Sequence, residues 1–99
     1  MYVDDLANAI FFFLKRNINE HFINIGSGME YTISNYVDLV IKEIGFKGSI
    51  KFNKKMPNGT MRKIMDSSLA QKYGWKTKYN FKEALKKTYI DFLNSSYNY

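Results

Sequence analysis

Apolar side chains recur at helical spacing in four parts of the chain. The clearest case lies between Thr32 and Gly45, where apolar residues repeat at intervals of three and four positions. Thr32 can accept a free backbone N–H group at the start of this helix, and Gly45 can end it in the left-handed conformation. Similar spacing predicts three more helices, over residues 3–14, over 67–73 after an Asp66 cap, and over 81–93 after an Asn80–Glu83 capping box.

Three shorter runs have the pattern of β-strands. They are residues 22–25 (Phe-Ile-Asn-Ile), residues 49–52 (Ser-Ile-Lys-Phe) and residues 63–65. The first is followed by Gly-Ser-Gly at 26–28, which we interpret as a turn, because the third glycine and the lysine of nucleotide-binding loops are missing. The order helix, strand, helix, strand, loop, helix, helix predicts an α/β fold with about four helices and two or three short strands.

Three consecutive aromatic residues, Phe11, Phe12 and Phe13, make the first predicted helix apolar on nearly all sides. A helix of this kind packs against partners on more than one side. The three rings therefore belong either to a central core or to an interface through which the chain forms a homo-oligomer.

The segment over residues 54–66 concentrates four cations and the chain's only proline in a short loop. Asn58 and Gly59 favour a tight turn because both residues tolerate positive φ. Such a turn can hold Lys55, Arg62 and Lys63 around a shared anion, with arginine offering a planar fork for phosphate and lysine a compact charge. The alternative is a solvated basic hairpin with no ligand.

Charge and composition narrow the function classes. The net charge is +6, and residues 46–99 carry twelve cations against three acids, which points to an anionic partner such as a nucleotide, a nucleic acid or a membrane surface. The chain has no cysteine and a single histidine, His21, which excludes disulfides, thiolate metal sites and histidine metal clusters. The apolar runs are too short to span a bilayer and Met1 is followed by acids, so we expect a cytoplasmic protein without a membrane partner.

Several motifs resemble extended short-chain dehydrogenases/reductases. Residues 2–7 (Tyr-Val-Asp-Asp-Leu-Ala) and 23–28 (Ile-Asn-Ile-Gly-Ser-Gly) are similar to segments of that family. Residues 57–66 (Pro-Asn-Gly-Thr-Met-Arg-Lys-Ile-Met-Asp) resemble a Pro-Asp-Gly-Thr-Pro-Arg-Lys-x-x-Asp run of the GDP-L-fucose synthases. The C-terminal pattern of that subfamily continues at Gly74-Trp75, at 83–85 (Glu-Ala-Leu), and at Thr88, Tyr89 and Phe92.

The resemblance implies a GDP-sugar-binding role. GDP-L-fucose synthases epimerise a GDP-4-keto-6-deoxy sugar and reduce it with NADPH. By this likeness Lys63 and Arg62 face the GDP diphosphate or its ribose, and Asn58 stands where the family has an aspartate that can contact the sugar nucleotide. Met61 replaces a proline and Met56 stands where a lysine is common.

Other family elements are absent from this sequence. There is no Gly-x-x-Gly-x-x-Gly cofactor loop, and no tyrosine is followed by a lysine four residues later, so no catalytic residue is assigned. The resemblance implies that residues 1–99 form a single C-terminal, substrate-binding portion that lacks the Rossmann domain, binds no cofactor itself and is inactive alone. Its expected partners are a GDP-sugar and the missing Rossmann portion. A small nucleic-acid-binding module and a part of another nucleotide-sugar epimerase or dehydratase are the alternatives.

Overall fold

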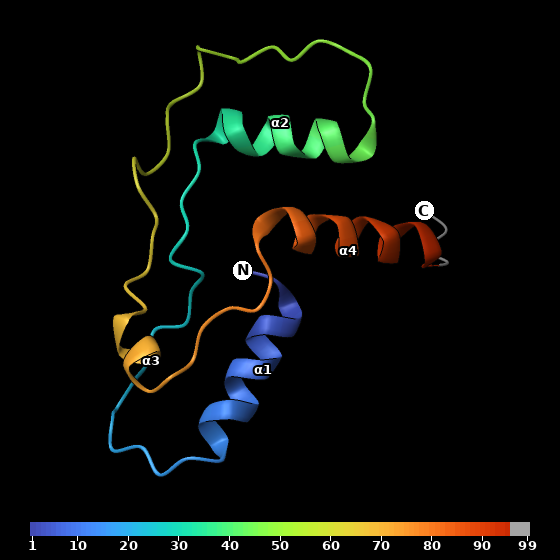
Figure 1. Cartoon of the computed structure of the whole chain (residues 1–99). Helices are drawn as coiled ribbons and strands as arrows, with labels where there is room; N and C mark the ends of the chain where they lie inside the picture. Colours follow the sequence, from blue (N-terminus) through green and yellow to red (C-terminus); the bar gives the residue numbers. More distant parts are fainter. Residues whose placement is uncertain (96–99) are drawn as a thin grey trace.

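The computed structural model describes residues 1–95 and contains four helices in that range (Figure 1). The helices are α1 at Val3–Leu14, α2 at Ile33–Ile44, α3 at Ser68–Lys72 and α4 at Phe81–Asn94. The four helices expected from the apolar spacing are therefore confirmed, with ends that differ by no more than one residue.

The predicted caps explain both ends of α2 and the start of α4, whereas α3 begins after Ser67 and not directly after the predicted Asp66 cap. Asn35 donates its backbone N–H to the Thr32 hydroxyl at 3.2 Å, and Gly45 ends α2 with a φ of 67°. Asn80 and Glu83 form a capping box at the start of α4, with each side chain accepting from the other's backbone N–H. Local side-chain chemistry is thus sufficient to fix where α2 and α4 begin.

The predicted strands do not form within residues 1–95, so the expectation of two or three short strands is wrong for the described range. Residues 22–25 show the alternation of a strand, since Ile23 and Ile25 are half-buried while Phe22 and Asn24 are exposed. A strand also needs a neighbour that takes up its backbone N–H and C=O groups. Residues 20–32 and 54–67 run past each other in opposite directions (Figure 1), but no backbone hydrogen bond joins them.

A small apolar core lies where α1, α3 and the segment after α3 meet. Ala9, Ala70 and Trp75 are buried there, and Phe12, Phe13, Ile23 and Ile25 pack around them. Trp75 donates its indole N–H to the Asn8 side chain at 3.1 Å. The buried carboxylate of Asp5 accepts the backbone N–H groups of Lys78 and Tyr79, so the chain beyond Trp75 is held against the start of α1.

The three consecutive phenylalanines are divided between core and solvent. Phe12 and Phe13 pack against the core, whereas Phe11 is 58% exposed with the Lys15 ammonium 3.8 Å from its ring centre. Only Phe11 therefore remains accessible enough for the self-association that the sequence suggested, and that association stays a proposal.

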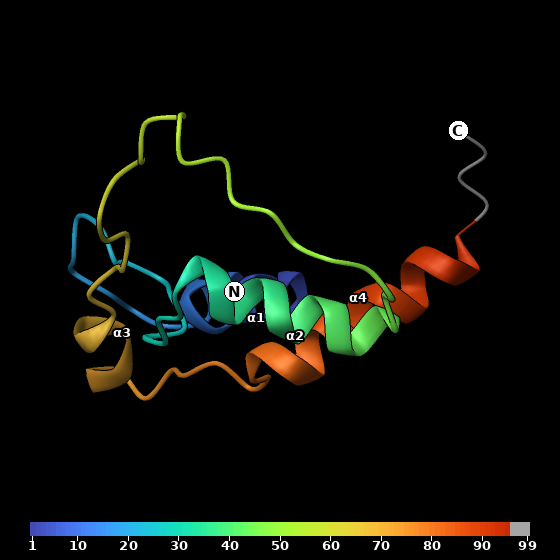
Figure 2. The same ribbon diagram turned by 90° about the horizontal axis from the view of Figure 1, so that it is seen from above.

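A second packed region joins α2 to α4, which lie alongside each other in Figures 1 and 2. The rings of Tyr31, Tyr36 and Phe81 meet between them, with centroids 4.8–5.9 Å apart. Rings at these separations gain energy beyond their buried area. Aromatic contacts therefore fix the approach of α4 to α2.

The chain is less compact than is usual for a domain of its length. The radius of gyration is 17.0 Å, whereas about 13 Å is usual for a domain of this length. The accessible surface is 8828 Å², against roughly 5,900 Å² for a compact protein of this mass. The excess includes large apolar side chains such as Leu14, Phe22 and Leu93. Within residues 1–95 no helix is both long and apolar enough to cross a bilayer.

Candidate functional site

The basic loop over residues 54–66 bends earlier than its sequence suggests. The backbone turn closes between Met56 N–H and the Asn53 carbonyl at 3.3 Å, and the Asn53 side chain accepts the Lys55 N–H at 3.1 Å. Asn58 and Gly59 both keep negative φ, so the predicted tight turn at that pair is wrong. Asn53 supplies a local side-chain turn, and without paired strands nothing imposes a hairpin turn at 58–59.

The four predicted site residues are placed differently. Lys63 lines a hollow beside residues 25–29, whereas Lys55 and Asn58 lie in the exposed part of the loop, outside that hollow. Arg62 bonds through its Nε to both carboxylate oxygens of Glu30, at 2.8 and 3.1 Å. The structure thus brings Lys63 to a concave surface and pairs Arg62 with Glu30, while the binding roles of all four remain predictions.

The hollow at Lys63 has a volume of about 230 Å³ and is lined by Gly26, Ser27 and Gly28, with Ile64 and Met65 on the side of the basic loop. Residues 26–28 are irregular chain, so the turn predicted there is wrong. The three backbone N–H groups of this segment donate to no acceptor within the described residues. Gly28 has a φ of 67°, a conformation that glycine adopts without cost.

Packing also restricts which side chain residue 26 can carry. A methyl group on Gly26 would lie 3.0 Å from the Ser67 hydroxyl oxygen and 3.6 Å from the Met65 Cβ. Glycine at position 26 therefore allows residues 26–28 to approach residues 65–67 closely. Within residues 1–95 the Arg62–Glu30 contact is the one ion pair, so Lys63 has no carboxylate partner in that range.

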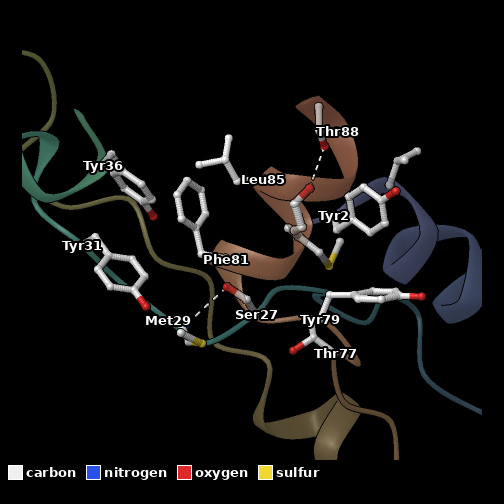
Figure 3. A pocket seen from close by; sticks show the side chains of 13 residues that line it. Tyr2, Ser27, Met29, Tyr31, Tyr36, Thr77, Tyr79, Phe81, Leu85 and Thr88 are labelled. Atoms are coloured by element: carbon white, nitrogen blue, oxygen red, sulfur yellow. Dashed lines mark hydrogen bonds between the residues drawn. The ribbon is translucent and has the colours of Figure 1, made fainter. Parts of the chain in front are cut away.

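A larger pocket of about 460 Å³ adjoins the first (Figure 3). The two hollows share Met1, Ser27, Met29 and Tyr36 as wall residues. The remaining wall of the larger pocket is mainly aromatic and aliphatic, with hydroxyl groups at intervals, and consists of Tyr2, Val3, Tyr31, Thr77, Tyr79, Phe81, Ala84, Leu85 and Thr88.

The tyrosines of this pocket offer neutral hydroxyl groups. Desolvation, followed by the nearby Asp4 carboxylate, raises the pKa of Tyr2 above its usual value. A phenol with a raised pKa stays protonated at neutral pH and can donate a hydrogen bond to an anionic ligand without repelling it.

Sequence reasoning identified Lys63 but missed its surroundings. Residues 26–28 were interpreted as a turn because their spacing lacks the other residues of a nucleotide loop, and the lysine opposite them comes from a distant part of the sequence. The aromatic wall was also missed, because its members come from three separate segments, residues 1–3, 27–36 and 77–88, and form no local motif. The one sequence signal that could have indicated the hollow was the Gly-Ser-Gly at 26–28, which follows the apolar run at 22–25.

The described residues contain no group of three or more metal-binding side chains. They also do not fit NADPH: residues 26–32 are irregular chain and α2 begins only at Ile33, so no helix starts directly after the Gly-Ser-Gly segment at 26–28. No chemistry is therefore assigned to a metal or nicotinamide on these residues.

Comparison with known proteins identifies relatives among enzymes named for nucleotide sugars. A probable GDP-L-fucose synthase 1 of Oryza sativa is 43% identical over 90% of this chain, GDP-L-fucose synthase 1 of Arabidopsis thaliana is 40% identical over 99%, and the GDP-L-colitose synthase of Yersinia pseudotuberculosis is 37% identical over 99%. The chain spans 27%, 30% and 32% of these relatives' lengths, respectively. No protein-family model matches the chain.

These matches first show that the chain is similar to enzymes named as synthases of GDP-sugars. More narrowly, the chain is related by sequence to the GDP-L-fucose synthases, and the resemblance is to a C-terminal portion of them. The resemblance noted on the sequence motifs is therefore confirmed.

Proposed function

We propose that this chain provides the GDP-sugar-binding portion of a GDP-L-fucose synthase-like enzyme and is inactive alone. The observation that carries the proposal is the similarity to enzymes named for GDP-sugars over nine-tenths or more of the chain. GDP-L-fucose is the favoured ligand, and another nucleotide sugar is the alternative, since one relative is named a GDP-L-colitose synthase.

Lys63 is the residue proposed to hold the ligand's diphosphate. Its ammonium has no acidic partner within the described residues, and it lines the same hollow as Gly26, Ser27 and Gly28, whose backbone N–H groups donate to no acceptor within those residues. Charge-assisted hydrogen bonds of this kind are about twice as strong as neutral ones. Arg62 lies next to it, but Glu30 neutralises part of its charge, so Arg62 is expected to contribute less than Lys63.

The chain is proposed to work with a larger partner portion. The open shape and the excess accessible surface indicate that many apolar side chains are available to pack against further polypeptide. In a GDP-L-fucose synthase-like enzyme that polypeptide is the Rossmann portion, which carries NADPH and the catalytic Ser-Tyr-Lys set. Reduction is therefore assigned to the partner portion and sugar-nucleotide binding to this chain.

The proposal is tested by calorimetric titration of the purified chain with GDP and GDP-L-fucose. Wild-type protein should bind both weakly, and Lys63→Ala should weaken binding about tenfold, the loss of one charge-assisted contact. Lys47→Ala is the matched control, because Lys47 is also exposed but does not line the hollow that contains Lys63. Equal affinities for the wild type and Lys63→Ala would reject the assignment of the diphosphate to Lys63.

A nucleic-acid-binding function is the second candidate, favoured by one observation. Lys54 and Lys55 are exposed and lie outside the hollow that contains Lys63, as expected for residues that contact a phosphate backbone. Binding of RNA or DNA would then fall steeply with salt, and Lys54→Ala and Lys63→Ala would reduce it equally. Binding of GDP with a loss confined to Lys63→Ala would exclude this candidate.

A further inference from the structure

We propose that the exposed side of α1 is the surface on which the remaining polypeptide of a GDP-L-fucose synthase-like enzyme docks. This inference rests on the proposed function, which gives the chain a larger partner portion, and it adds the place where that portion binds. Lys63 and residues 26–28 take no part in it, because they lie outside α1.

One side of α1 is apolar and uncovered. Its large side chains recur at spacings of three and four residues, are 43–79% exposed, and comprise Val3, Leu6, Ile10 and Leu14. In a helix with 3.6 residues per turn, this spacing places the four side chains in one row, the α1 stripe. Asp5 and Ala9 are the buried residues of α1 and lie outside this row. The α1 stripe is therefore not the side through which α1 packs against the core.

The α1 stripe carries no charged residue, unlike the exposed sides of the other long helices. Exposed residues of α2 and α4 include charged side chains such as Lys42, Lys86 and Asp91, as expected for helix faces in water. The charged residues of α1 are Asp4 and Asp5, and both lie outside the stripe. Depletion of charge is typical of the centre of a protein interface.

A hollow of about 460 Å³ adjoins one end of the α1 stripe. Its apolar wall consists of two stripe residues, Ile10 and Leu14, together with Phe13, Ile18 and Ile23. Its charged residues already have partners in the chain, since Arg16 donates to the Phe12 carbonyl at 2.8 Å. The Glu20 carboxylate likewise accepts from the Tyr73 hydroxyl at 3.2 Å. The surface left for a partner is therefore mainly apolar, which suits an anchoring apolar side chain from the docked polypeptide.

The lengths of the relatives indicate what occupies this surface. The chain spans 27%, 30% and 32% of three of them and resembles their C-terminal portion, so most of their polypeptide precedes the part that matches this chain. Met1 adjoins the beginning of α1 (Figure 1). In an enzyme organised like these relatives, the preceding polypeptide therefore joins the chain at one end of the α1 stripe.

The test measures how fast iodoacetamide alkylates a cysteine on the α1 stripe. The chain has no cysteine of its own, so Ile10→Cys and Leu14→Cys each introduce a single thiol. Each variant is prepared as the isolated chain and as a fusion in which this chain replaces the matched portion of GDP-L-fucose synthase 1 of Arabidopsis thaliana. Peptide mass spectrometry measures labelling at the introduced site.

Labelling at both stripe positions should be about tenfold slower in the fusion, because a thiol covered by packed polypeptide reacts only when the structure opens. Lys86→Cys, at an exposed position of α4, is the control and should react at the same rate in both proteins. Circular dichroism of each isolated variant confirms that its helices are retained.

Three results would overturn the inference. The first is equal labelling rates at Ile10→Cys and Leu14→Cys in the isolated chain and the fusion. The second is slower labelling in the fusion at Leu93→Cys on α4 with unchanged labelling of the stripe, since the partner portion would then dock elsewhere. The third is labelling of the stripe in the isolated chain that slows as its concentration rises, which would assign the stripe to a second copy.

The ligand proposal is decided separately, by the GDP titration of the isolated chain. Slow labelling of the stripe in the fusion together with no GDP binding would support the docking surface and reject the proposed ligand. GDP binding together with equal labelling rates would reject the docking surface and support the ligand.

Discussion

The core around Trp75 and the basic loop are held in place by very different means. The core region combines three buried apolar residues with hydrogen bonds from distant parts of the chain, including those from Trp75 to Asn8 and from Lys78 to Asp5. All side chains of residues 53–66 are exposed, and one ion pair, Arg62–Glu30, links their side chains to a distant segment. Burial thus fixes the first region, whereas the second depends on an interaction that water and salt weaken.

The difference shows how stability and binding are divided in this chain. Residues that hold the structure together lie around α1, α3 and Trp75, and the residues proposed to bind ligand lie where contacts within the chain are few. A loop that is weakly tied can be ordered by its ligand. Substitutions in the core should therefore change stability, and substitutions in the loop should change affinity.

The largest expected effect is on stability, from Trp75→Ala. Trp75 is 2% exposed, and truncating a buried tryptophan typically costs about 3–5 kcal/mol. Urea unfolding followed by circular dichroism measures the change. Met61→Ala is the control, because Met61 is 94% exposed and its removal should leave the midpoint unchanged. Equal midpoints for the two variants would show that the Trp75 cluster is not the core.

Asp5→Ala should have the next largest effect. Its carboxylate is 2% exposed and accepts two backbone N–H groups, which would be left without partners at a cost of about 1–3 kcal/mol. Asp4→Ala is a matched control, since Asp4 is exposed in the same helical turn and interacts mainly with the helix dipole. Thermal unfolding should show a clear drop for Asp5→Ala and a small one for Asp4→Ala.

A weaker effect is expected for the pair that ties the loop. Arg62 and Glu30 side chains are 68% and 39% exposed, so a double-mutant cycle with Arg62→Ala and Glu30→Ala should give a coupling of about 1 kcal/mol or less. The coupling should fall further at high salt. A coupling as large as the loss in Asp5→Ala, or one unaffected by salt, would show that the loop is fixed as firmly as the core.

The smallest effect concerns pH. A hydrogen bond from the Ser68 N–H lowers the pKa of Asp66 below its usual value, because it favours the ionised form. A carboxyl whose pKa is lower in the folded state stabilises the protein above its unfolded pKa, and this contribution is lost as pH falls through the folded value. Thermal unfolding from about pH 5 to 3 should therefore show a steeper loss for the wild type than for Asp66→Asn. Parallel curves would remove Asp66 from the acid response.

How much the sequence predicts depends on whether a feature is local. The helices were predicted because their apolar spacing and their caps, such as Thr32 and Asn80, lie within a few residues of one another. The absence of strands was not predicted. Residues 22–25 alternate between exposed and half-buried side chains, as in a strand, but no neighbouring strand pairs with them in the described range. Lys63 was predicted as a site residue from charge and motif. The position of residues 26–28 and of the aromatic wall near Lys63 depends on contacts between distant segments, which the sequence does not reveal.

The most direct test of the account is a nuclear magnetic resonance titration of the ¹⁵N-labelled chain with GDP. The account predicts that the amide signals of Gly26, Ser27 and Gly28 shift with both GDP and pyrophosphate, and that Lys63→Ala suppresses these shifts. Shifts that leave these three amides unchanged and fall instead on residues 46–52 or the last turn of α4 would contradict it.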